Sequence, residues 1–199
     1  MFTGIVESLG RVVAMVGDEN QKTFTIESTF AQELIPGQSV SHNGVCLTVE
    51  KIDAKASVYN VTLIRQTLER SSLGALRVSS NVNLERCVRA DARLDGHVVQ
   101  GHVDSVGTIV LAENEPGQKR FRIEFPDKFA SLIVPRGSIC VDGISLTVAN
   151  SGPGQVFDVC LIPHTLEVTI ASQWEVGTTV NLEFDIIGKY VKKWMDLRG

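Results

Sequence analysis

The sequence predicts an all-β protein made of two homologous small barrels followed by a short helix. Three observations lead to this prediction. The chain repeats itself at a spacing of 97 to 99 residues, short alternating apolar runs dominate both copies, and residues 187–199 carry a helical pattern instead. Because a period near 98 residues is the size of a small domain and too long for a solenoid repeat, each copy is expected to form its own barrel.

The duplication is clearest in three blocks that keep their order along the chain. Residues 43–49, 63–69 and 81–85 recur as residues 142–148, 161–167 and 179–183. Identical residues fill 13 of these 19 aligned positions, whereas average composition gives about one match. The sequence therefore predicts an N-terminal barrel over residues 1–97 and a C-terminal barrel over residues 98–186.

Strands follow two glycine turns at equivalent positions. Asn43-Gly44 and Asp142-Gly143 favour tight hairpin turns, because glycine takes a positive φ at little cost. The residues after each turn alternate strictly. The apolar set that should face the core is Val45, Leu47, Val49, Ile144, Leu146 and Val148, and the opposite set is Cys46, Thr48, Ser145 and Thr147.

The tail has a different period. Its apolar residues recur at helical spacing, and its lysines occupy the other face. The apolar stripe consists of Ile187, Tyr190, Val191, Trp194 and Met195. Two interpretations stay open: the helix packs on its own subunit, or it packs against copies of itself and assembles an oligomer.

Composition excludes several classes of protein. The net charge is −4 and no Lys/Arg cluster is present, which argues against nucleic-acid binding. No apolar run is long enough to span a membrane, and the N-terminus shows no signal peptide. The four cysteines lie far apart, which indicates a reducing compartment. We expect a cytoplasmic protein.

The two copies differ at particular polar positions. Cys46 aligns with Ser145, Ile5 with His102, and Gln66 with His164. This asymmetry suits a site that holds two similar ligands and treats them differently, although drift between duplicates also explains it. Cys46 is either a small packing residue or a functional thiol.

The two histidines near the start of the second copy do not indicate a metal site. His97 and His102 are five residues apart, so neither a strand nor a helix would bring their rings together, and no acidic or cysteine cluster completes a ligand shell. Taken alone, His102 is either structural or an acid–base group. Ser145 and Thr147 either satisfy local backbone groups or line a pocket for a polar ring.

Five segments together resemble riboflavin synthase of the alpha-chain type, a family of lumazine-binding repeats. They occur in the family's order, and the resemblance extends over nearly the whole chain, including the duplication and the tail. They are Met-Phe-Thr-Gly-Ile-Val at the start, Asn-Gly-Val-Cys-Leu-Thr-Val from Asn43, Gly-His-Val-Val-Gln-Gly-His-Val-Asp from Gly96, Asp-Gly-Ile-Ser-Leu-Thr-Val from Asp142, and Leu-Ile-Pro-His-Thr-Leu-Glu from Leu161.

The resemblance implies a six-stranded Greek-key barrel in each half and a homotrimer held by the C-terminal helix. The implied reaction is a dismutation: one 6,7-dimethyl-8-ribityllumazine gives a four-carbon unit to another, yielding riboflavin and 5-amino-6-(D-ribitylamino)uracil. The family needs no metal, nucleotide or redox cofactor. A lumazine synthase shell around the trimer is a further partner that the sequence leaves undecided.

The resemblance also assigns two half-sites, which would meet between the N-terminal barrel of one subunit and the C-terminal barrel of its neighbour. The N-terminal half-site would use Gly4, Ile5, Val6, Ser39, Ser41, Cys46, Leu47, Thr48 and a loop of Thr62, Leu63, Ile64, Arg65, Gln66 and Thr67. The C-terminal half-site would use Gly101, His102, Val103, Arg136, Ser145, Leu146, Thr147 and a loop of Cys160, Leu161, Ile162, Pro163, His164 and Thr165.

The implied catalytic residues are Cys46, His102, Ser145, Thr147 and Ser39. His102, polarised by Ser145 and Thr147, would move the proton of the 7-methyl group. Cys46 would activate the acceptor, as a thiolate or by placing water. Arg136 stands where the family often has Lys, which keeps the charge but changes its geometry.

Two other functions compete with this interpretation. A non-catalytic lumazine or flavin carrier of the antenna type would keep the barrels without needing reactive side chains. A flavin-dependent reductase would need a nicotinamide domain, and the chain has no G-x-G-x-x-G on a strand–helix unit. The joint presence of Cys46, His102, Ser145 and Thr147 favours the enzyme.

Overall fold

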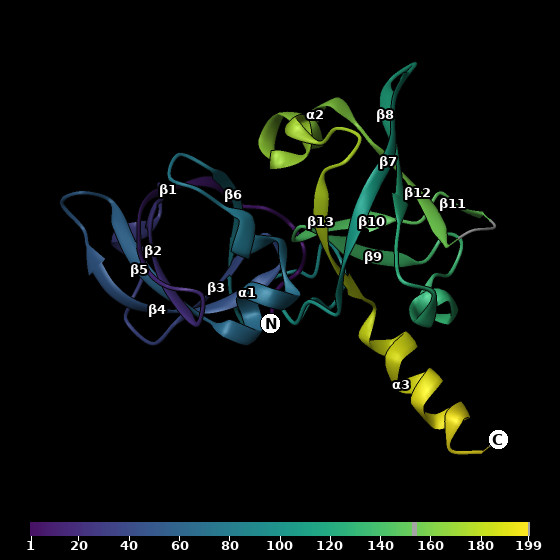
Figure 1. Cartoon of the computed structure of the whole chain (residues 1–199), viewed down its shortest axis with the longest axis horizontal. Helices are drawn as coiled ribbons and strands as arrows, with labels where there is room; N and C mark the ends of the chain where they lie inside the picture. Colours follow the sequence, from purple (N-terminus) through teal and green to yellow (C-terminus); the bar gives the residue numbers. More distant parts are fainter. Residues whose placement is uncertain (153–154, 199) are drawn as a thin grey trace.

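A closed β-barrel and a curled β-sheet, which we call the first and second barrels, lie side by side, and a helix extends away from the second (Figure 1). The computed structural model describes residues 1–152 and 155–198. The predicted all-β, two-barrel architecture is confirmed, including the helix that follows the second barrel.

The first barrel is closed and has six strands, in the order β1-β2-β5-β4-β3-β6. Every neighbouring pair is antiparallel. The strands are β1 (Ser8–Gly17), β2 (Gln21–Glu27), β3 (Ser39–His42), β4 (Val45–Asp53), β5 (Val58–Ile64) and β6 (Asn81–Arg86). The helix α1 (Arg65–Arg70) and 3-10 turns at Ala31–Glu33 and Ser72–Ala75 connect them.

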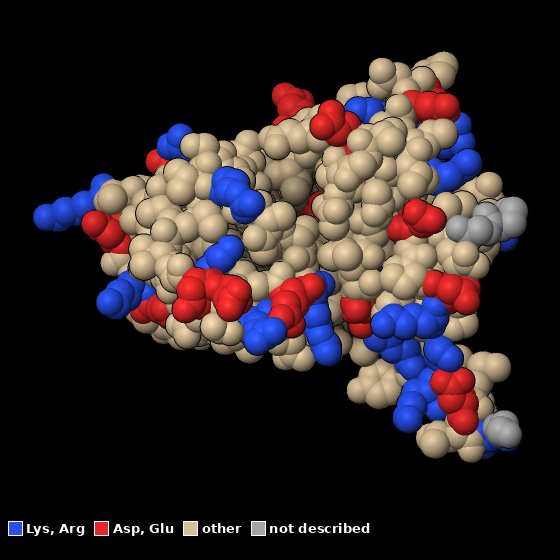
Figure 2. Space-filling view, viewed as in Figure 1, with Lys and Arg blue, Asp and Glu red and all other residues tan. Residues whose placement is uncertain are grey.

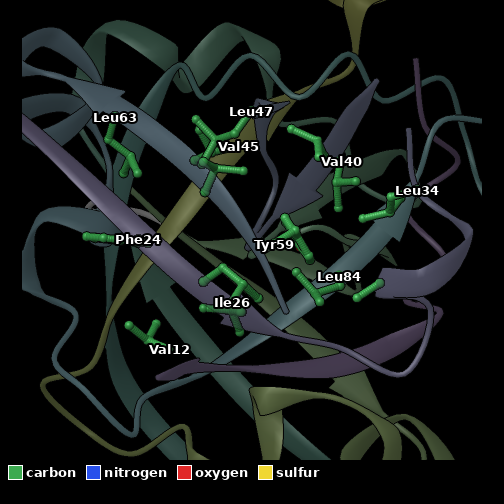
Figure 3. Packing of buried hydrophobic residues seen from close by; sticks show 14 of the residues in the cluster. Val12, Phe24, Ile26, Leu34, Val40, Val45, Leu47, Tyr59, Leu63 and Leu84 are labelled. Atoms are coloured by element: carbon green, nitrogen blue, oxygen red, sulfur yellow. The ribbon is translucent and has the colours of Figure 1, made fainter. Parts of the chain in front are cut away.

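The interior of this barrel is filled by the apolar side of each strand. Val45, Leu47 and Leu63 all point inward toward Phe24 and Tyr59 (Figure 3). This is the alternation that the sequence predicts after the Asn43-Gly44 turn.

The second half differs from the expected six-stranded barrel. In the described residues it is a curled sheet of seven strands, in the order β10-β9-β13-β7-β8-β12-β11. Its strands are β7 (Ser105–Glu115), β8 (Gln118–Glu124), β9 (Ser138–Val141), β10 (Ile144–Thr147), β11 (Asn150–Gly152), β12 (Val156–Leu161) and β13 (Thr179–Phe184). The helix α2 (Pro163–Val168) and 3-10 turns at Asp127–Leu132 and Ile170–Gln173 complete this half.

The extra strand arises because the equivalent of β4 is divided. β10 pairs with β9, and β11 pairs with β12, with Val148 and Ala149 between the two pieces. Residues Asn150, Ser151 and Gly152 are exposed and have low strand propensity, so they do not extend β10 as one continuous strand.

The hairpin turns of the two halves abut. Gly44 and Gly143 both have positive φ, at 81° and 79°. A Cβ on Gly44 would lie 2.9 Å from the backbone nitrogen of Gly143, and a Cβ on Gly143 would lie 2.7 Å from that of Gly44. The glycines are therefore required twice, by the turn and by the close approach of the barrels.

The C-terminal helix α3 (Ile186–Asp196) is capped by Asp185, whose side chain accepts a hydrogen bond from the backbone N–H of Ile187. Its apolar stripe is exposed, with Tyr190 72% and Trp194 54% accessible. Figure 2 shows α3 standing out from the surface with basic side chains along part of it. An ion pair between Lys189 and Asp104, 2.6 Å long, ties the helix to its own barrel.

No helix in the described residues is both long enough and apolar enough to cross a membrane.

Candidate functional site

The hairpin β3–β4 presents Cys46 on the outer side of the first barrel. Cys46 pairs with Ser41, and Thr48 pairs with Ser39, across the two strands. Cys46 is half-buried against an apolar cluster formed by Phe2, Val99 and Cys140. The predicted orientation away from the barrel core is confirmed, and it leaves the thiol beside the junction of the two halves.

A cleft of about 270 Å³ opens next to Cys46. It is lined by Val45, Cys46, Gln66, Thr67, Arg70, Ser71, Gly101, His102 and Val103. Six of these residues belong to the set expected from sequence, whereas Val45, Arg70 and Ser71 do not. Thiol, imidazole, amide, hydroxyl and guanidinium groups thus surround one small space, which suits a polar ring with several acceptor atoms.

The expected grouping of residues into half-sites needs one correction. Gly101, His102 and Val103 lie against the first barrel, where the backbone N–H of Cys46 donates to the carbonyl of Gly101 over 2.9 Å. At the equivalent position of the second barrel, the backbone N–H of Ser145 donates to the carbonyl of Gly4 over 2.7 Å. We call residues 2–6 and 99–103, which precede the two barrels, the entry segments. Each entry segment therefore packs on the barrel of the other half.

The exchange has a physical cause. Phe2 and Val99 form an antiparallel bridge, with N–O distances of 2.7 and 3.1 Å between their backbones. Because the two entry segments cross at this bridge, the one that begins at Phe2 runs to the second barrel and the one at Val99 runs to the first. Val6 accordingly packs on the core of the second barrel and Val103 on that of the first.

Ser145 interacts with a different histidine from the one expected. Its hydroxyl lies 2.7 Å from Nδ1 of His97, whereas His102 lies in the cleft beside Cys46. The expectation that Ser145 polarises His102 is therefore wrong within one chain. Burial lowers the pKa of His97, which favours the neutral ring. From the sequence His97 is weighed only as a metal ligand, so its contact with Ser145 was not predicted.

Burial also raises the pKa of the Cys46 thiol, and the Ser39 side chain opposes part of this rise. Because the thiolate is the nucleophilic form, the raised pKa favours a neutral thiol that donates a hydrogen bond or positions another group. A thiolate in the resting protein is therefore disfavoured relative to the neutral thiol.

A second cleft, of about 830 Å³, runs along the segment that joins the two barrels. It brings together Ile5 and Ser39 from the expected set, next to Glu85 and Arg86. Arg86 is not free to bind an anion there, because it forms ion pairs of 2.8 Å with Glu7 and 2.7 Å with Glu33.

The two expected binding loops are strand ends that continue directly into helices. β5 ends at Ile64 and α1 begins at Arg65; β12 ends at Leu161 and α2 begins at Pro163. The extended backbone of Ile64 and Ile162 places each of these residues at a helix N-cap, and proline suits the first helical position. Ile64 and Ile162 are exposed, at 58% and 56%, and His164 is also exposed.

Several expected residues line neither of these two clefts. The side chains of Leu47, Leu63, Leu146 and Leu161 pack into the barrel cores, and Ser41 is 2% exposed. Thr62 bonds to Thr23 over 2.9 Å between hydroxyls, Arg65 pairs with Glu69, and Cys160 is half-buried on β12. Thr48 and Thr147 are exposed on the outer face, and Thr165 is half-buried on α2.

Arg136 has a special backbone. Its φ is +67°, and its N–H donates to the carbonyl of Val148 over 2.8 Å, as the N–H of Gly37 donates to the carbonyl of Val49 in the first half. An arginine thus occupies a left-handed position that glycine fills in the other copy.

Two buried carboxylates, Glu85 on β6 and Glu183 on β13, were also missed. They hold the crossing entry segments through backbone N–H groups. Both lie in the repeated block Val-Asn-Leu-Glu. The recurrence of this glutamate in the two copies is the sequence feature that could have indicated its structural role.

Within residues 1–152 and 155–198, no three His, Cys, Asp or Glu side chains lie close enough together to hold a metal ion. All four cysteines are free thiols.

The fold and the cleft define a class: a protein of two homologous β-domains with a small polar cleft beside the hairpin of the first barrel. The model of the lumazine-binding domain family matches this chain twice, over residues 3–87 and 100–185. The chain belongs to this family, whose riboflavin synthases it resembles along its whole length.

Individual relatives and structures support this placement. The riboflavin synthase of Mycobacterium tuberculosis is 43% identical over 202 aligned positions. The alignment covers all of this chain and all of the relative. The riboflavin synthase of Bacillus subtilis is 36% identical, over 98% of this chain and 90% of the relative. The crystal structure of LumP complexed with 6,7-dimethyl-8-(1'-D-ribityl) lumazine superposes with a TM-score of 0.83 at 20% identity, covering 92% of this chain and 98% of LumP.

Proposed function

We propose that this protein is a riboflavin synthase, a transferase that converts two 6,7-dimethyl-8-ribityllumazine molecules into riboflavin and 5-amino-6-(D-ribitylamino)uracil. The observation that carries the proposal is full-length identity of 43% with a riboflavin synthase, combined with a cleft that contains both Cys46 and His102.

The chemistry sets three requirements for the site. A proton must leave the 7-methyl group of the donor, a nucleophile or water must add to the acceptor ring, and the two rings must be held together. His102 stands beside Cys46 at the first half-site, so we assign it proton transfer there. Cys46 acts as a neutral thiol that positions the acceptor or a water molecule.

At the second half-site we assign ligand contact to the hydroxyl of Ser145, with Thr147 farther along the same outer face. His97 orients this hydroxyl through its 2.7 Å contact. Ser39 lies on the outer face of the first barrel, next to Cys46. The unlike groups of the two half-sites suit two identical substrates with different roles.

The active enzyme is proposed to be a homotrimer in which the first barrel of one subunit faces the second barrel of its neighbour. The support is the exposed apolar stripe of α3, which includes Tyr190 and Trp194 and packs against little of its own chain. The boundaries of the two barrels, the cytoplasmic location and an enclosing lumazine synthase shell stay predictions.

The direct test mixes the purified protein with 6,7-dimethyl-8-ribityllumazine and follows riboflavin by its absorbance. Riboflavin and the uracil product should appear in equal amounts, with two lumazines consumed for each. Tight binding of lumazine without any riboflavin would refute the enzyme and favour the binding protein of the LumP kind, to which the fold alone is similar.

A further inference from the structure

The buried carboxylate of Glu183 binds the segment that carries His102. Its Oε1 accepts the backbone N–H of Gln100 over 2.6 Å, and its Oε2 accepts those of Gly101 and His102, each over 2.9 Å. Glu183 is 3% exposed and lies on β13 of the second barrel. One carboxylate therefore fixes three consecutive backbone groups, and bonds of this charge-assisted kind are among the stronger ones in proteins.

The same segment touches the first barrel directly. The carbonyl of Gly101 accepts from the backbone of Cys46, and a Cβ on Gly101 would lie 2.5 Å from the Cβ of Cys46. Gly101 has a φ of +81°, so the turn admits little variation. Because His102 is the next residue, the anchoring of this turn decides where its ring stands in the cleft.

Glu85, at the equivalent position of the first barrel, binds the other entry segment in a similar way. It accepts the N–H of Thr3 over 2.6 Å, the Thr3 hydroxyl over 2.7 Å and the N–H of Gly4 over 2.9 Å. This places Gly4 against Ser145 in the other half-site. The two carboxylates are similarly buried, so Glu85 is a matched control for Glu183.

We propose that Glu183 is a positioning residue that sets the place of His102 opposite Cys46, without touching substrate itself. Its consequence for turnover rests on the proposed function. The second barrel thereby completes the half-site of the first. In the same way Glu85, on the first barrel, positions Ile5 opposite Ser145.

The test compares Glu183→Asp with Glu85→Asp. Each variant keeps the charge but withdraws the carboxylate by one methylene, so the three donors can no longer all reach it in place. The readouts are the alkylation rate of Cys46 by iodoacetamide, resolved by peptide mass spectrometry, together with kcat, KM and the melting temperature.

Glu183→Asp should raise the Cys46 alkylation rate about fivefold or more, because the covering segment loosens. It should lower kcat by about 10- to 100-fold, the range expected for a misplacement near 1 Å, with KM changed less than about threefold. Glu85→Asp should leave Cys46 alkylation within about twofold of wild type, although it also lowers kcat.

Equal Cys46 alkylation in the two variants, or wild-type kcat in Glu183→Asp, overturns the proposal. If Glu183→Asp does not fold, Glu183→Gln is compared with Glu85→Gln by the same criteria. A wild-type protein that forms no riboflavin refutes the proposed enzyme instead, and the alkylation comparison still decides whether Glu183 positions the segment.

Discussion

Asn83 and Asn181 occupy equivalent positions in the two halves, and each holds the barrels together by one donated and one accepted hydrogen bond to the other half. Asn83 donates its amide to the carbonyl of Asp142 and accepts from the backbone N–H of Ile170, both over 2.8 Å. Asn181 donates to the carbonyl of Asn43 over 2.8 Å and accepts from the N–H of Ser72 over 2.6 Å. Both asparagines are almost fully buried.

Replacing Asn181 with Ala should destabilise the protein by about 3 kcal/mol. The change removes two hydrogen bonds and leaves the carbonyl of Asn43 and the N–H of Ser72 without their partner at the barrel interface. Urea unfolding monitored by circular dichroism measures the loss. Asn114→Ala, at an exposed position, is the control and should cost little; equal losses in the two variants would contradict the role of Asn181.

A buried His42–Tyr59 pair makes the first barrel sensitive to acid. Nδ1 of His42 lies 3.0 Å from the carbonyl of Val40, and its Nε2 lies 2.8 Å from the Tyr59 hydroxyl. Burial lowers the pKa of His42 to about 4 from its ordinary 6.5. Between these values the unfolded chain binds a proton that the folded protein does not, so the stability contributed by neutral His42 falls as pH falls, by up to about 3 kcal/mol.

The second barrel supplies a matched replacement, because Val141 and Phe157 occupy the equivalent positions. The double variant His42→Val, Tyr59→Phe should lose less stability than wild type when pH falls from 6.5 to 4. Asp142, whose pKa burial raises to about 7, has the opposite pH effect but is present in both proteins and cancels in the comparison. Parallel stability curves for the two proteins over this range would rule out His42 as the cause.

Cys46→Ser should reduce riboflavin formation at least about tenfold while changing the affinity for lumazine less than about threefold. A hydroxyl preserves the shape of the side chain but differs from the thiol in nucleophilicity and hydrogen bonding. Steady-state kinetics and fluorescence titration with the lumazine separate turnover from binding. Cys46→Ala is the control for packing, and wild-type turnover in both variants would leave Cys46 a packing residue.

Deleting residues 187–199 should give monomers with folded barrels and little activity, because the exposed apolar stripe of α3 is the proposed contact between subunits. Sedimentation velocity measures the assembly. A full-length variant, Val191→Glu, should dissociate as well, whereas Lys193→Glu, on the polar face, should not. A truncated chain that still assembles would remove α3 from the interface.

The repeat and the turn dipeptides were sufficient to predict most of the fold. Alternation after Asn43-Gly44 placed Val45 and Leu47 in the core and Cys46 outside it, because a strand turns successive side chains to opposite faces. The split between β10 and β11 was not predicted, although the weak strand formers from Asn150 onward carried a signal for it.

What the sequence by itself determined is the part governed by local periodicity: two similar barrels, their turns, the outward face of each hairpin and the final helix. Only the tertiary structure decided that the entry segments cross, so that His102 joins Cys46 and His97 joins Ser145. The physical reason is that these segments have no periodic pattern of their own. Their positions depend on the Phe2–Val99 bridge and on Glu85 and Glu183, contacts between residues about 80 to 100 positions apart that no local pattern encodes.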